Sequence, residues 1–196
     1  MLPSLATLRL TVDHMAPGHA QALADFFQRN ERHLAPWDPP RPAGIKEPAF
    51  WQAECERAVE DHESGSVVRW LMFLPDAPDR VIGRINFTQI ARGPFQSCML
   101  GYAIDAEHQG RGLMHEALEA TIEHVFTVLR LHRIQANHVP ENRRSAALLE
   151  RLGFVREGLA KNYLFIDGAW RDHVLTARLN PAFDAGIFSP RPFPPA

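Results

Sequence analysis

A glycine-rich segment, Gln109-Gly110-Arg111-Gly112-Leu113-Met114, has the residue types and spacing that most directly indicate chemistry in this sequence. It lies immediately before a segment with helical periodicity. Paired glycines at a helix N-terminus let several backbone amides point at one anion, and the helix dipole adds partial positive charge there. We therefore expect a pyrophosphate-binding loop; the alternative is a tight turn that needs glycine only for its positive φ.

The residues around this loop exclude three other interpretations. No Gly-Lys-Ser/Thr follows the glycines, so the loop is not a P-loop, and the third glycine of a dinucleotide fingerprint is absent. The pair His115-Glu116 begins like a metalloprotease motif, but Glu119 stands where a second histidine is required. We therefore expect no metal in the site.

A second motif, Asn142-Arg143-Arg144-Ser145, opens a predicted short helix that ends in Leu152-Gly153-Phe154. Together with the glycine-rich loop, these segments resemble the acetyl-CoA-binding signature of the GNAT superfamily of N-acetyltransferases. The resemblance implies acetyl-CoA as cosubstrate, with its pyrophosphate held by the backbone amides of residues 109–114. It also implies that Tyr102–Ile104 line the pantetheine arm and the acetyl group on a splayed strand, and that Asn142 bonds the arm.

The likeness covers nearly the whole chain and extends to one branch of that superfamily. Its segments are Asn30-Glu31-Arg32-His33-Leu34-Ala35-Pro36-Trp37, then Gly101-Tyr102, and finally Ile166-Asp167-Gly168-Ala169-Trp170-Arg171-Asp172-His173-Val174-Leu175, which is the most specific to the branch. They are similar to the RimJ-type ribosomal-protein alanine N-acetyltransferases. This resemblance implies that the acceptor is a peptide or protein N-terminus, in that branch the alanine of a small-subunit ribosomal protein.

Two positions depart from the general superfamily pattern. Met114 closes the loop where many members have glycine or alanine, and Leu149 stands where many carry a tyrosine that protonates the departing thiolate. Leucine cannot donate a proton, whereas Ser145 lies one turn earlier on the same helix face. The resemblance to N-terminal acetyltransferases implies that this serine acts on the leaving group, so we expect Ser145 to protonate or hydrogen-bond the CoA sulfur. A serine that only satisfies the helix N-terminus is the alternative.

The proposed acceptor needs only a modest base. A free α-amine has a pKa of about 8, against about 10.4 for lysine, so roughly a tenth of it is neutral at pH 7. Glu107, just before the loop, is a candidate base acting through a chain of water molecules. Further candidates are Glu141, Asp172 and His138, and for each candidate a solvated surface role is the alternative. The backbone N–H near Ala103 is expected to donate to the tetrahedral oxyanion.

Other residues are expected beside the two substrates. We place Glu31 and Trp37 at the acceptor groove, with packing of Trp37 against the first helix as the alternative. The pair Arg143-Arg144 either binds the 3′-phosphate of CoA or is simply solvated.

The elements that position these residues follow from hydrophobic periodicity and from proline and glycine. We predict strands over residues 7–12, 67–74, 81–90, 98–104, 133–139, 159–166 and 173–179. Helices are predicted over residues 17–30, 48–62, 114–129 and 145–152, with a proline-rich surface loop over 34–48. The last two strands are joined by a turn at Asp167-Gly168.

This order of elements, with the resemblance, predicts one mixed α/β (α+β) domain of GNAT fold over residues 1–180. We expect a central, mostly antiparallel sheet of about seven strands, splayed between the fourth and fifth, with about four flanking helices. The proline-rich tail, residues 181–196, should form neither a helix nor an inner strand. It is then either flexible or packed as an extended arm on a second subunit of a homodimer.

Composition limits the partners. Lysine and arginine number 21 against 23 acidic residues, so the net charge of -2 gives no reason to expect direct nucleic-acid binding. The two cysteines, Cys55 and Cys98, are too few and too scattered for a disulfide framework or a zinc site, and we expect buried thiols. The start of the chain carries no long apolar run, so we expect neither a signal peptide nor a membrane span, and a cytoplasmic protein.

The reaction we expect is direct transfer from acetyl-CoA to an N-terminal amine without a covalent enzyme intermediate, and the lack of a cysteine in these motifs is consistent with it. Two alternatives stay open. One is a small-molecule amine or antibiotic acetyltransferase, whose donor half would be identical. The other, from a different class, is a CoA-binding regulatory module without turnover.

Overall fold

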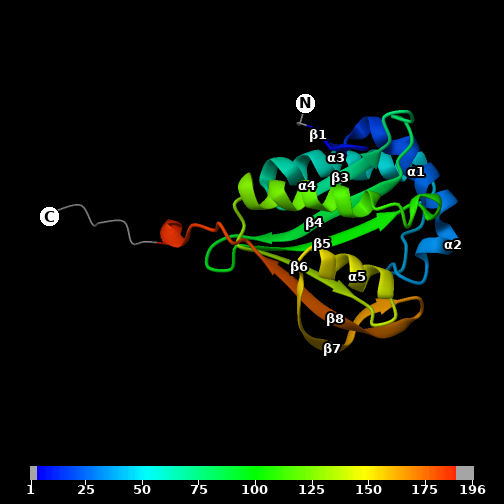
Figure 1. Ribbon diagram of the computed structural model, residues 1–196. Coiled ribbons are helices and arrows are strands. Elements are labelled where there is room, and N and C mark those ends of the chain that lie inside the picture. Colours follow the sequence, from blue (N-terminus) through cyan, green and yellow to red (C-terminus); the bar gives the residue numbers. More distant parts are fainter. Residues whose placement is uncertain (1–3, 189–196) are drawn as a thin grey trace.

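An eight-stranded sheet with the order β1-β2-β3-β4-β5-β6-β8-β7 forms the centre of the computed structural model, which describes residues 4–188 (Figure 1). The strands are β1 Leu5–Ala6, β2 Thr11–His14, β3 Val68–Phe73, β4 Gly83–Ala91, β5 Ser97–Ile104, β6 Arg133–His138, β7 Val155–Ile166 and β8 Ala169–Leu179. The α-helices are α1 Ala20–Arg29, α2 Glu31–Leu34, α3 Pro48–Ser64, α4 Leu113–Thr127 and α5 Arg143–Arg151. Three short 3₁₀-helices are η1 Pro17–His19, η2 Ala106–His108 and η3 Ala185–Phe188.

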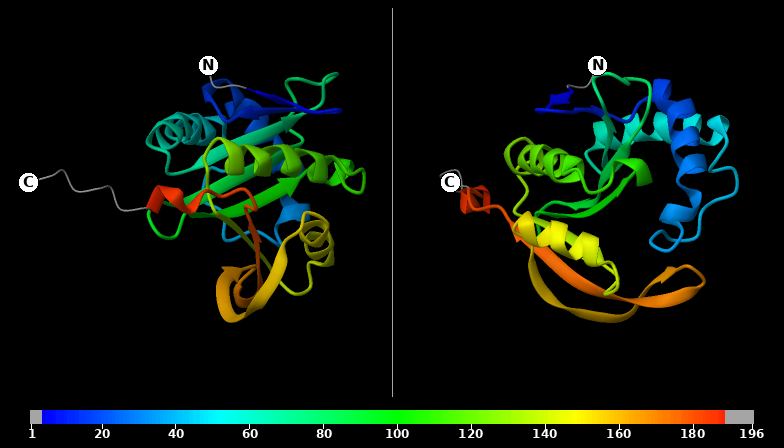
Figure 2. Two further views of the ribbon diagram at one scale, coloured as in Figure 1. Left: turned by 60° about the vertical axis from the view of Figure 1, so that its left-hand side comes forward. Right: turned by 45° about the vertical axis from the view of Figure 1, so that its right-hand side comes forward.

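The junction between β5 and β6 is the feature that shapes the site. The two strands pair in parallel only from Ser97 opposite Arg133 to Met99 opposite Gln135, whereas β5 continues to Ile104 along β4. All other strand pairs are antiparallel. Beyond Met99 the two strands diverge, and the β7–β8 hairpin bends away from β4 and β5 (Figure 2). The predicted splay is therefore confirmed.

The two faces of the sheet are covered by different helices. Along β3, Trp70 and Met72 belong to a core shared with α4 and α5, whereas Leu71 and Phe73 belong to a second core shared with α1 and α3. This alternation is the two-residue period of a strand buried on both faces. Figure 2 shows α1 and α3 on one side of the sheet and α4 on the other. On β5 the same period turns Tyr102 toward the core shared with α4 and α5 and Ala103 toward the second core.

Local sequence signals set the ends of α3. Pro48 occupies its first turn, where a missing backbone N–H costs nothing, and Gly65 ends the helix in the left-handed region at φ +70°.

Among the described residues, no helix has the length and apolar character that crossing a membrane requires.

The first predicted strand, over residues 7–12, is wrong in its extent. Thr7 N donates to Leu10 O at 2.9 Å and the Thr7 hydroxyl also donates to this carbonyl, so the chain turns there. The turn divides the segment into β1 and β2, which pair with Leu5 opposite Val12. The sheet consequently has eight strands where about seven were expected.

The two ends of the last hairpin also differ from expectation. β7 begins at Val155, four residues before its predicted start. The sequence did not show this start, because most side chains of β7 are exposed and two register shifts interrupt its alternation. In the tail, η3 forms where no helix was expected, over a segment that contains no proline. The Phe183 ring lies 5.0 Å from that of His132, so the start of the tail packs on the domain. Residues 189–196 lie outside the described part of the chain.

Candidate active site

The glycine-rich loop has the backbone conformation that its sequence predicts. Gly110 and Gly112 have φ of +73° and +76°, and Gly112 is the N-cap of α4. No atom lies within 4 Å of the Cβ that Gly110 lacks, so conformation rather than space accounts for this glycine. The first intrahelical hydrogen bond runs from Glu116 N to Gly112 O at 3.1 Å. Within residues 4–188 no side chain caps the first turn of α4, so its backbone amides have the arrangement that can bind an anion. That this loop binds a pyrophosphate stays a prediction.

The start of the chain braces this loop, a contact that sequence reasoning missed. Arg9 Nη1 donates to Arg111 O at 2.9 Å, and Arg9 Nε lies 2.7 Å from Glu116 Oε2. The Thr7 hydroxyl donates to the other carboxylate oxygen of Glu116 at 2.6 Å. Burial raises the pKa of Glu116, but hydrogen bonds from Thr7 and Arg9 and the Arg9 charge outweigh it and lower the pKa. Glu116 thus stays ionised and holds Arg9 against the loop.

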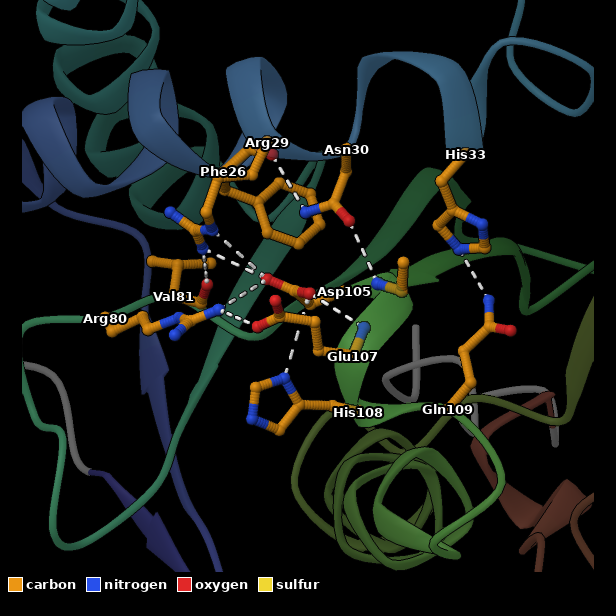
Figure 3. A network of polar contacts seen from close by, with 11 residues as sticks. Phe26, Arg29, Asn30, His33, Arg80, Val81, Asp105, Glu107, His108 and Gln109 are labelled. Carbon is orange, nitrogen blue, oxygen red and sulfur yellow. Dashed lines mark hydrogen bonds and ion pairs between the residues drawn. The ribbon is translucent and has the colours of Figure 1, made fainter.

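Gln109 connects the loop to elements on both sides of the splay. Its Nε2 lies 2.5 Å from His33 Nε2 on α2, and its Oε1 accepts a hydrogen bond from Arg144 on α5 (Figure 3 shows the His33 contact). One residue of the pair Arg143-Arg144 therefore binds the loop itself. The sequence does not indicate these two contacts, because Gln109 is 76 positions from His33 and 35 positions from Arg144.

A buried carboxylate, Asp105, fixes the segment that leads into the loop (Figure 3). Only 2% of its side chain is exposed, and its Oδ2 lies 3.1 Å from Arg29 Nη2 and 3.5 Å from Arg80 Nη2. Burial raises the pKa of Asp105, whereas hydrogen bonds, led by the backbone N–H of Glu107, and the Arg29 charge lower it overall. Asn30 Oδ1 accepts from Ala106 N at 2.9 Å. These contacts attach η2 to the end of α1.

Ser145 lies in the first turn of α5, beside the splayed part of β5. The Asn142 side chain caps the helix, since its Oδ1 accepts from Ser145 N at 3.0 Å. The Ser145 hydroxyl lies 2.7 Å from the Tyr102 hydroxyl on β5. Burial raises the pKa of Tyr102 to about 12. Leu149, one turn along α5, is 1% exposed and packs in the core.

The backbone amides of β5 point alternately to its two sides. Asp105 N donates to Ile82 O, on the side of β4, at 2.8 Å. Alternation turns the amide of Ala103 toward β4 as well, so the amides of Tyr102 and Ile104 face the opening. The predicted oxyanion donor, a backbone N–H of this strand near Ala103, stays a prediction.

The carboxylates predicted as bases all lie in ion pairs. Glu107 Oε2 lies 2.6 Å from Arg80 Nη2, and 71% of its side chain is exposed. Glu141 pairs with Arg171 at 3.4 Å. Asp172 pairs with Lys161 at 2.7 Å, and the Lys161 hydrogen bond lowers the pKa of Asp172.

The remaining predicted residues lie on separate elements. His138 is buried at the end of β6, with its Nδ1 2.9 Å from Val139 O. Trp37 follows α2 and is 38% exposed. Glu31 pairs with Lys46 at 2.5 Å, and this hydrogen bond lowers the pKa of Glu31. Their roles at the acceptor groove and as a base stay predictions.

The described part of the chain offers no group of three or more His, Cys, Asp or Glu side chains placed to hold a metal ion.

A model of the acetyltransferase (GNAT) domain matches residues 9–155. This chain belongs to the GNAT acetyltransferase family. The predicted family and its fold are therefore confirmed.

Several GNAT relatives match nearly the full length. The [Ribosomal protein uS5]-alanine N-acetyltransferase of Escherichia coli K12 is 45% identical over 182 residues, which cover 93% of each chain. The crystal structure of the ribosomal-protein-S5-alanine acetyltransferase from Vibrio fischeri has a TM-score of 0.90 at 36% identity and covers 93% of this chain and 100% of that one. Mycobacterium smegmatis RimJ, solved in complex with CoA-disulfide, has a TM-score of 0.84 at 28% identity and covers 96% and 90%.

Proposed function

We propose that this GNAT acetyltransferase transfers the acetyl group of acetyl-CoA to the N-terminal alanine of a ribosomal protein. The observation that carries the proposal is the 45% identity to the Escherichia coli uS5-alanine enzyme over 93% of both chains. A small-molecule acetyltransferase would share the part of the domain that binds acetyl-CoA. Its acceptor-binding part, however, would not be expected to resemble that of the uS5-alanine enzyme. A ribosomal acceptor also favours the cytoplasm as the place of action.

The glycine-rich loop suits the pyrophosphate of acetyl-CoA. The positive φ angles of Gly110 and Gly112 turn backbone amides toward the N-terminus of α4, where they can bind an anion. Arg9 and Gln109 hold the loop in place through hydrogen bonds. The opening beyond Met99 gives the pantetheine arm a strand edge to bind, formed by Tyr102–Ile104. The Asn142 oxygen caps α5, which leaves its Nδ2 as the donor for the arm.

Acetyl-CoA supplies an activated acetyl group, and the protein aligns and polarises it. The amides of Tyr102 and Ile104 are the donors that face the acetyl oxygen, where negative charge develops. Ser145 donates to the sulfur that leaves. An α-amine with a pKa of about 8 needs little help to lose its proton, so an exposed carboxylate such as Glu107 acting through water is sufficient.

Steady-state release of CoA thiol tests this function. We expect turnover with a peptide that copies the N-terminus of protein uS5 and begins with alanine, and none with the same peptide blocked at its α-amine. Spermidine and an aminoglycoside serve as competing acceptors. Faster turnover with either amine would contradict the proposal in favour of a small-molecule enzyme, and acetyl-CoA binding without turnover on any amine would favour a regulatory module.

A further inference from the structure

The contact between Tyr102 and Ser145 crosses the opening between β5 and β6. β5 pairs with β6 only as far as Met99, so Tyr102 lies on the part of β5 that no longer pairs with β6. Ser145 lies on α5. Their hydroxyl oxygens are 2.7 Å apart. Because Asn142 Oδ1 already accepts from the Ser145 backbone amide, the Ser145 hydroxyl is not needed to cap its helix.

Either hydroxyl group can be the donor in this contact, and the two directions have different consequences for Ser145. A serine hydroxyl has one hydrogen to donate and two lone pairs that accept. Burial raises the pKa of Tyr102 to about 12, so its phenol keeps its proton at neutral pH and is able to donate. When the phenol donates to Ser145 Oγ, the single hydrogen of Ser145 must point elsewhere, and the donated bond polarises the serine O–H.

We propose that Tyr102 is a positioning residue for acetyl transfer, whose phenol donates to Ser145 Oγ and so directs the Ser145 hydrogen toward the departing CoA sulfur. This inference rests on the proposed function. Leu149, on the same helix as Ser145, is 1% exposed in the core and brings no polar group. The hydroxyl that supports Ser145 therefore comes from the sheet.

In the transfer step, the acceptor nitrogen forms a bond to the acetyl carbonyl carbon, and the C–S bond breaks with its electron pair passing to sulfur. The Ser145 hydrogen bond stabilises this thiolate. The nitrogen loses its proton to water, and a proton from water completes the free thiol. Tyr102 keeps its own proton throughout.

The first test removes only the phenol oxygen. In Tyr102→Phe we expect kcat to fall about tenfold while KM for acetyl-CoA stays within about twofold, because the lost interaction acts on the leaving group. Tyr163, the only other tyrosine of the chain, is the matched control. Its hydroxyl, on β7, lies 3.2 Å from Asn137 Nδ2, and Tyr163→Phe should leave kcat unchanged.

A double-mutant cycle separates positioning from packing. If Tyr102 acts through Ser145, Tyr102→Phe should have no further effect on kcat in a Ser145→Ala enzyme. Losses that multiply in the double variant, or a raised KM at unchanged kcat, would overturn the proposal. Thermal unfolding of all four proteins sets an assay temperature at which each is folded.

The outcomes also separate this inference from the function on which it rests. A wild-type protein that acetylates no amine would overturn both. An active wild-type enzyme with multiplying losses would overturn the role of Tyr102 alone.

Discussion

Arg9 and Glu116, 107 positions apart in the chain, form an ion pair of 2.7 Å that holds the N-terminal segment against the start of α4. The same guanidinium donates to Arg111 O inside the glycine-rich loop. The brace therefore acts on the segment to which we assign pyrophosphate binding.

Arg9→Ala should weaken acetyl-CoA binding about fivefold, because an exposed ion pair contributes about 1 kcal/mol or less. Titration calorimetry measures the change. Arg57→Ala is the control, since Arg57 forms an exposed pair of 2.7 Å with Glu54 on α3. Equal affinity in the Arg9 variant and the wild type would show that the brace does not shape the loop.

Gly112→Ala tests the loop conformation itself. A non-glycine residue in the left-handed region costs about 1–2 kcal/mol, so the loop should strain or shift, and acetyl-CoA affinity should fall about tenfold. Gly65→Ala is matched, since Gly65 ends α3 at φ +70°. Both variants should lose similar unfolding free energy, and only Gly112→Ala should lose affinity. Unchanged acetyl-CoA affinity in Gly112→Ala would argue against the pyrophosphate assignment.

The free energy of unfolding should decrease as the pH is lowered from 6.5, because of a buried histidine. His14 is 7% exposed, and burial, followed by repulsion from His62 and His124, lowers its pKa from 6.5 to about 3. Between these values the unfolded chain binds a proton that the folded protein does not. The unfolding free energy should therefore be fully present above pH 6.5 and decrease as pH falls, by up to about 1.4 kcal/mol per unit.

Urea unfolding at pH 7, 6 and 5 measures how steeply the unfolding free energy depends on pH. The His14→Phe variant should make this dependence weaker. It keeps an aromatic ring beside Trp70, whose ring centroid lies 3.6 Å from that of His14. An equal slope in the variant would assign the pH dependence to other groups.

Both thiols should be inert in the native protein. Cys55 and Cys98 are 0% and 1% exposed, and burial raises the pKa of each to about 12. N-ethylmaleimide should label neither in the folded enzyme and both in guanidinium chloride, with full activity retained after the native treatment. Stoichiometric labelling of the folded protein with loss of activity would point to a thiol in the reaction.

The sequence predicted those parts of the site that depend on neighbours in the chain. Gly110 and Gly112 ahead of a 3.6-residue period identified the loop and α4, and the Asn142 motif identified the start of α5. These features are local, because a helix terminus is set by a few consecutive residues.

Contacts between distant segments were not predictable from single elements. Tyr102 and Ser145 are 43 positions apart, and their contact depends on how far β5 and β6 diverge and on which face of β5 carries Tyr102. The Arg9 brace depends in turn on the turn at Thr7, which places Arg9 beside α4. A period of two residues gives two faces but does not say which one meets α5.

The most direct test of the proposed function is mass spectrometry of purified ribosomal protein uS5, with a free N-terminal alanine, after incubation with this enzyme and acetyl-CoA. We predict a single added acetyl group, located by fragmentation on the α-amine of the alanine. Acetyl groups on lysine side chains, or an unmodified protein alongside turnover on a small amine, would contradict the account.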